Sequence, residues 1–184
     1  MPVLLFLQAC GPNVWEGVSA TLASKVDILA EVGLQQWHQA YLLMKLEYGR
    51  GVACPPQLFQ QSLAAHQADL ARLGPRAHFE RALAQAVQQL AVGQVVEVET
   101  VLPDPDGEGG VWVDVTLPSL MIAVQAGSRW HVLRNVEPLQ QTGSALARER
   151  LPRGWGWHVV VVPWTAFQAL ICEYVDHDGL VAGL

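Results

Sequence analysis

The spacing of apolar residues divides the chain into two parts near residue 93. Before this point, apolar residues recur every three or four positions, which is the period of an amphipathic helix. Glycines, often followed by proline, separate four such stretches, and the first stretch begins with an asparagine that is a candidate N-cap. We therefore predict four helices joined by short turns, at residues 13–33, 34–49, 55–74 and 75–93.

After residue 93 the period changes to two. Segments 94–102 and 111–117 alternate between apolar and polar residues, whereas 120–127 and 157–164 are continuous apolar runs, as in strands buried on both faces. Helices are predicted at 142–151, where Pro152 would end the helix, and from Thr165 onward. The order helix, three strands, helix, strand, helix predicts a mixed α/β sheet flanked by helices and preceded by an α-helical hairpin array.

Composition narrows the class of protein. The chain has 184 residues, of which 51% are hydrophobic and 15% charged, so it is long and apolar enough to bury a sizeable core. No apolar run reaches the ~18 residues of a membrane helix, and we expect no membrane partner. The three cysteines are widely spaced, which favours a reducing compartment without a disulfide framework.

The charge distribution is uneven. The net charge of −6 does not indicate a nucleic-acid-binding protein by itself. Residues 94–184 contain eleven acidic side chains and five arginines, and all five arginines lie between Arg129 and Arg153. This distribution allows the five arginines to form one basic face on an otherwise acidic protein.

Several segments occur in an order that resembles a known family. They include "HFERALAQAVQQL", "VWVDVTLP", "MIAVQAGSRWH" and "GWHVVVVPW". Together they resemble a RAP domain, found at the C-terminus of FAST-kinase-like mitochondrial proteins and of organellar RNA-maturation factors in algae, plants and parasites. The resemblance covers residues 76–184. It implies two domains, an α-helical segment at 1–74 and a RAP-like α/β domain at 75–184.

RAP domains are similar to restriction-endonuclease-like nucleases, in which carboxylates at the ends of two strands hold Mg²⁺. In this comparison Asp114 stands at the position of the first carboxylate. Gln125 falls on the position of the second, and Gly127 falls on the position after the spacer. An amide and a glycine provide no negative charge for a divalent cation. The resemblance therefore implies relic positions, no catalytic residues, and no metal or other cofactor.

Both strand-end residues also have a purely structural interpretation. Asp114 could cap a turn or pair with an arginine, and Gln125 could hydrogen-bond to neighbouring backbone. An Asp-His-Asp sequence at 176–178 looks like a metal site, but adjacent side chains point in different directions, so we interpret it as a surface turn.

A second group of residues is predicted to bind RNA, with arginines on phosphate and a tryptophan stacked on a base. These candidates are Arg129, Trp130, His131, Arg134, Arg148 and Arg150. The alternatives are a core position for the tryptophan, a structural hydrogen bond for the histidine, and a solvated helix face for the last two arginines.

Three functions follow from these patterns. The first is an RNA-binding or ribonucleoprotein subunit with a degenerate nuclease fold, acting in RNA processing or stability or with a ribosome. The second is a structural protein-interaction subunit of an organellar ribosome or a similar complex. The third, an active endonuclease, is disfavoured by the missing carboxylates. The resemblance implies a mitochondrial location, or a chloroplast as the alternative, although no transit peptide is visible.

Overall fold

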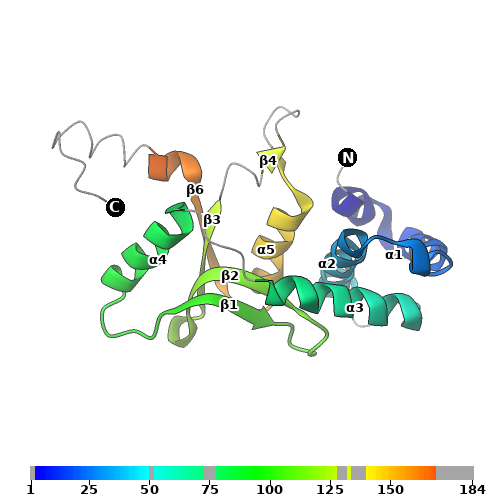
Figure 1. Ribbon diagram of the computed structural model, residues 1–184, viewed down its shortest axis with the longest axis horizontal. Helices are drawn as coiled ribbons and strands as arrows, with labels where there is room; N and C mark the ends of the chain where they lie inside the picture. The colour runs from blue at the N-terminus through cyan, green and yellow to red at the C-terminus, as the bar shows by residue number, and fades with distance from the viewer. Residues whose placement is uncertain (1–2, 50–51, 73–77, 128–131, 134–139, 169–184) are drawn as a thin grey trace.

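Helices form the first part of the chain, and a mixed sheet with further helices forms the second (Figure 1). The structure is a computed structural model that describes residues 3–49, 52–72, 78–127, 132–133 and 140–168. The helices of the first part and the helix that leads into the sheet are α1 (Val3–Ala23), α2 (Glu31–Tyr48), α3 (Pro56–Ala71) and α4 (His78–Leu90).

The boundary between the first two helices differs from the prediction. α1 ends at Ala23, a 3-10 turn (η1, Val26–Ile28) follows, and Gly33 lies in the first turn of α2 instead of ending a helix. Val26, in this 3-10 turn, is buried in the larger hydrophobic cluster. The predicted end of the second helix is confirmed, since Gly49 caps α2 with a φ of 80° that favours glycine.

Four strands form the main sheet. They are β1 (Glu97–Pro103), β2 (Gly110–Leu117), β3 (Ile122–Gly127) and β6 (His158–Pro163), in the order β1-β2-β3-β6. The first three strands are antiparallel neighbours, and β3 and β6 are parallel. A 3-10 turn, η2 (Pro118–Leu120), links β2 to β3. The predicted mixed α/β sheet, preceded by helices, is confirmed.

Helix α5 (Gly143–Gly154) makes the crossover between the two parallel strands. Two residue pairs, β4 (Val132–Leu133) and β5 (Gln140–Gln141), form a small separate sheet ahead of α5. Residues 164–168 are helical, so the last predicted helix begins one residue before Thr165.

Two expectations for this part of the chain were wrong. Pro152 does not end its helix, because α5 continues to Gly154 with Pro152 buried in its last turn. Strand β6 is not central, since in the described part of the chain it has a partner only on the β3 side. Its side chains are correspondingly exposed or half-buried, with Val160 48% exposed.

Two hydrophobic clusters hold these elements together. The larger combines side chains of the first helices, such as Trp37 and Leu42, with Val113 of β2 and Leu151 of α5. The smaller packs α4 against β2, β3 and β6. Because the larger cluster draws on both parts, the predicted boundary at residues 74/75 does not separate two cores.

Candidate functional site

Asp114 lies on β2 and is almost completely buried, with a relative exposure of 1%. Its Oδ2 accepts a hydrogen bond from the backbone N–H of Ala126 at 2.8 Å and one from the guanidinium of Arg148 at 3.3 Å. Arg148 comes from α5 and also donates from Nε to the carbonyl of Trp112 at 3.3 Å. Its guanidinium carbon lies 5.1 Å from the centre of the Trp112 ring. Asp114 is therefore part of a structural ion pair that ties α5 to the sheet.

Gln125 is buried on the neighbouring strand and also contacts α5. Its side-chain amide donates a hydrogen bond to the backbone carbonyl of Arg148. In a regular helix this carbonyl accepts from the N–H four residues later, but residue 152 is a proline and has no N–H. The amide of Gln125 supplies the missing donor, which the carboxylate of a nuclease could not do at neutral pH.

Gly127 ends β3 in a crowded place. A Cβ at this position would lie 3.1 Å from Cγ1 of Val161 and 3.2 Å from the carbonyl oxygen of Val162 on β6. Any side chain here would therefore push against the neighbouring strand. Placing an aspartate at 127 and a glutamate at 125 would disturb two fitted contacts, so these changes would not simply restore a metal site.

Asp114, Gln125 and Gly127 thus form a set of contacts between β2, β3, β6 and α5. A divalent cation at Asp114 would have to displace the guanidinium of Arg148. Among the residues that the structure describes, no group of three or more His, Cys, Asp or Glu side chains is placed to hold a metal ion. The role of these contacts is structural, because they attach α5 to the sheet.

The predicted RNA-binding arginines of α5 do not share a face. Arg148 reaches the sheet, whereas Arg150 forms an ion pair with Glu47 at the end of α2. Residues two apart on a helix point to nearly opposite sides, so these two arginines cannot form one basic patch. The other four candidates, Arg129, Trp130, His131 and Arg134, lie outside the described residues, as does the Asp-His-Asp sequence at 176–178.

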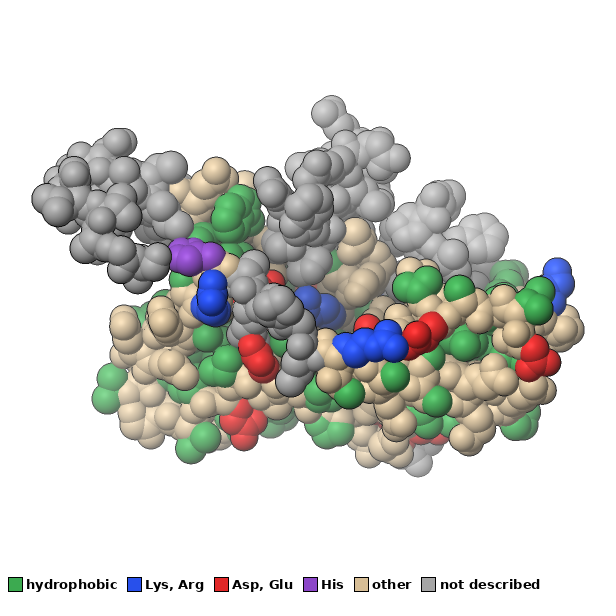
Figure 2. Space-filling model, in the orientation of Figure 1, with side chains coloured by type: hydrophobic (Ala, Val, Ile, Leu, Met, Phe, Trp, Pro, Cys, Tyr) green, Lys and Arg blue, Asp and Glu red, His purple; other side chains and the backbone are tan. Residues whose placement is uncertain are grey.

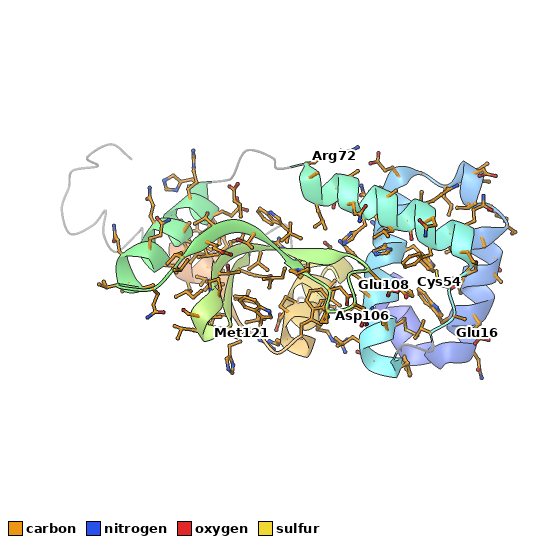
Figure 3. The ribbon with its side chains drawn as sticks, turned by 90° about the horizontal axis from the view of Figure 1, so that it is seen from below. Glu16, Cys54, Arg72, Asp106, Glu108 and Met121 are labelled. Carbon is orange, nitrogen blue, oxygen red and sulfur yellow. The ribbon has the colours of Figure 1, made fainter. Side chains whose placement is uncertain are left out.

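The turn between β1 and β2 carries a cluster that the sequence did not reveal. The ammonium group of Lys45, on α2, lies 3.0 Å from Asp104, 2.8 Å from Asp106 and 2.7 Å from Glu108. Burial works against the positive charge of Lys45, but the three carboxylates outweigh it and raise the pKa of the amine. The hydrogen bond from Lys45 lowers the pKa of Glu108. Figure 3 shows Asp106 and Glu108 where this turn meets the helices.

Two buried histidines donate hydrogen bonds to backbone carbonyls in and just after the same turn. His38 of α2 donates from Nε2 to the carbonyl of Glu108 at 2.7 Å, and His66 of α3 donates from Nε2 to the carbonyl of Gly110 at 2.7 Å. Their ring centres are 4.9 Å apart. Burial lowers the pKa of His38 to about 4 and also lowers the pKa of His66, so both rings are neutral at pH 7. Neutral rings avoid two positive charges side by side in the core.

A pocket of about 340 Å³ lies where α3, the start of β2 and α5 meet. Figure 2 shows this side of the molecule, which is hollowed near its centre and has basic side chains in and beside the hollow. The wall includes apolar groups and charged groups of both signs, among them Asp69, Glu80, Arg72 and Arg148. His66, Trp112 and Ser144 also line it. Only Arg148 among these was a sequence candidate, because the others meet only through tertiary packing.

Comparison with protein-family models gives no match, and a search of curated proteins finds no similar sequence. The resemblance to RAP domains therefore stays a prediction. In the described part of the chain, no helix is long and apolar enough to cross a membrane.

Proposed function

We propose that this chain is a non-catalytic RNA-binding subunit of a ribonucleoprotein, with a nuclease-like sheet that no longer cuts. The observation that carries the proposal is the engagement of Asp114 by Arg148 and Ala126, together with the amide of Gln125 at the position of the second carboxylate. A nuclease needs its carboxylates free to hold a cation, whereas here the Asp114 carboxylate is engaged in contacts that stabilise the fold and the second position carries an amide.

The pocket beside this centre supports binding rather than chemistry. It places the Arg148 guanidinium over the ring of Trp112, and Arg72 is a second arginine in its lining. Single-stranded RNA is recognised by stacking on aromatic rings or guanidinium planes, combined with cations for phosphate. An organellar location, mitochondrial or chloroplast, is part of the proposal through the RAP resemblance alone.

Salt dependence of RNA binding tests this function. Arg72 is 63% exposed and, among the described residues, forms an ion pair at 2.7 Å with the half-exposed Glu31, a surface pair that an RNA phosphate can replace. We expect Arg72→Ala to weaken binding of single-stranded RNA and to reduce the slope of log affinity against log salt by about one. Lys25→Ala removes the same charge from an exposed position beside η1 and should leave the slope unchanged. Absence of RNA binding by the wild-type chain would refute the proposal.

A structural subunit that binds protein is the second candidate, and a specific observation favours it. Apolar side chains are exposed at the end of the sheet where α4 leads into β1 and where β2 turns into β3. They are Leu90, Val92, Val95, Leu120 and Met121, with exposures of 83%, 86%, 66%, 47% and 40%. A hydrogen bond of 2.8 Å between Ser119 and Gln94 joins the two turns. Retained assembly into a complex after nuclease digestion of its RNA would favour this candidate.

A further inference from the structure

We propose that the pocket between α3, β2 and α5 binds the base of one unpaired RNA nucleotide, an inference that rests on the RNA-binding function proposed above. Its volume of about 340 Å³ is in the range of small-ligand sites, roughly 300–1,000 Å³. The pocket shares Arg148 with the Asp114–Arg148 pair but does not include Asp114.

His66 provides the first argument. This side chain lines the pocket and is 98% buried, with a relative exposure of 2%. Its Nε2 donates to the carbonyl of Gly110, so Nδ1 carries no proton in the neutral ring and is an acceptor. Among the described residues Nδ1 has no hydrogen-bond partner. A buried polar atom without a partner is costly, and a ligand N–H that reached Nδ1 would remove that cost.

The second argument is the pairing of Arg148 with Trp112 on the same wall. The guanidinium lies over the indole ring at 5.1 Å, and two of its five N–H groups donate to Trp112 and Asp114. These contacts hold the guanidinium plane in one orientation, as a stacking surface for a flat ring requires. Leu70, Val111 and Leu151 add apolar wall.

These features together specify the ligand. The pocket needs a flat ring that carries an N–H donor, attached to a group that an exposed cation can neutralise. Every nucleobase has N–H donors on its Watson–Crick edge, and its phosphate could exchange with Glu31 for Arg72 at the rim. Inorganic phosphate satisfies only the last requirement.

The test uses the full chain and two substitutions that introduce the same phenylalanine ring. Ser144 is an exposed residue of α5 that lines the pocket, so Ser144→Phe should fill the pocket without altering the core. Gln67→Phe puts the same ring on an exposed position of α3 outside the pocket and serves as control. We expect Ser144→Phe to weaken binding of a single-stranded RNA of about ten nucleotides by roughly tenfold, the loss of one base contact, and Gln67→Phe to leave binding unchanged.

A second measurement reports on His66 itself. In the chain with ¹⁵N-labelled histidine, cytidine 5′-monophosphate should shift the Nδ1 resonance of His66 as it accepts a hydrogen bond, and inorganic phosphate should not. If RNA binds but Ser144→Phe has no effect and His66 does not respond, the pocket inference is overturned and the RNA-binding function stands. If the mononucleotide shifts His66 but long RNA does not bind, the pocket accepts a free nucleotide base, and the RNA-binding function is overturned.

Discussion

Gln125 completes the helix that Pro152 interrupts. Its side-chain amide donates to the carbonyl of Arg148, the acceptor that would otherwise receive the N–H of residue 152. An amide can give this hydrogen bond and a carboxylate cannot, so a glutamine at the strand end and a proline in the last turn of α5 fit each other. Gln125, at the position that the resemblance assigns to a metal ligand of nucleases, stabilises α5 in this chain.

This pairing predicts a specific coupling. Gln125→Glu should lower the free energy of unfolding by about 2 kcal/mol, because it removes a donor from a buried carbonyl and brings a carboxylate toward it. Pro152→Ala restores the backbone N–H, so the same Gln125→Glu change should cost clearly less in that background. Urea denaturation of the four variants gives the coupling energy, and equal costs in the two backgrounds would contradict the pairing.

The Asp114–Arg148 pair predicts a stability effect where a nuclease would show a catalytic one. Asp114→Ala leaves the largely buried guanidinium and the N–H of Ala126 without their acceptor, and it should destabilise the chain by about 3 kcal/mol. Combining Asp114→Leu with Arg148→Met removes both charges and should recover part of this loss. If Asp114→Ala is as stable as the wild type by chemical denaturation, the ion pair is not holding α5.

The buried histidines predict a stability that falls in mild acid. Burial lowers the pKa of His38 to about 4, below its ordinary value of 6.5. Between these pH values the unfolded chain takes up a proton that the folded chain does not, so unfolding becomes easier as the pH falls. The expected loss from pH 7 to pH 5 is about 2 kcal/mol, and the lowered pKa of His66 acts in the same direction.

Urea denaturation at pH 8, 7 and 5 checks this expectation. Both states carry a neutral His38 above pH 7, so stability should be unchanged between pH 8 and pH 7. Equal stability at pH 7 and pH 5 would mean that folding does not lower the pKa of His38, which would contradict the burial of its ring. Glu108 of the same turn does not confuse the result, because its hydrogen bond from Lys45 lowers the pKa of this carboxyl group.

We expect the two glycines of the turn that contacts these histidines to differ in how much an alanine substitution destabilises the chain. Gly109 has a φ of 146°, and a Cβ there would lie 3.0 Å from Nε2 of His38, the atom that donates to the turn. Gly107 has a φ of 75° and open space around a Cβ. Gly109→Ala should therefore cost about 3 kcal/mol, and Gly107→Ala only about 1 kcal/mol, by thermal or urea denaturation. Similar costs at both positions would show that His38 does not confine the turn.

Local patterns predicted most elements of this fold. The alternation in 111–117 and the apolar run at 120–127 correctly indicated neighbouring strands, and Gly49 correctly marked a helix end. These features depend on residues close in sequence. The edge position of β6 was missed because its apolar run looks the same whether one or two strands flank it. Pro152 was misread because its missing N–H is compensated by Gln125, which is far away in the sequence.

The candidate site was less predictable than the fold. The structural interpretation of Asp114, a pair with an arginine, was considered from the sequence and is what the structure shows. The identity of its partner depended on where α5 crosses the sheet. Lys45 and the acidic turn are 59 to 63 residues apart, and His66 meets Gly110 across 44 residues. No local spacing encodes such contacts, so the clusters and the pocket could be found only in the folded chain.

The central proposal is that this chain binds RNA without cutting it, and one measurement tests both parts of the proposal. Purified full-length chain is incubated with end-labelled single-stranded RNA and Mg²⁺ or Mn²⁺, and each sample is divided between filter binding and a denaturing gel. The account predicts retained RNA that remains intact, with the same result for a folded Gln125→Ala variant. Metal-dependent cleavage that disappears in Asp114→Asn, or no retention of RNA at low salt, would contradict it.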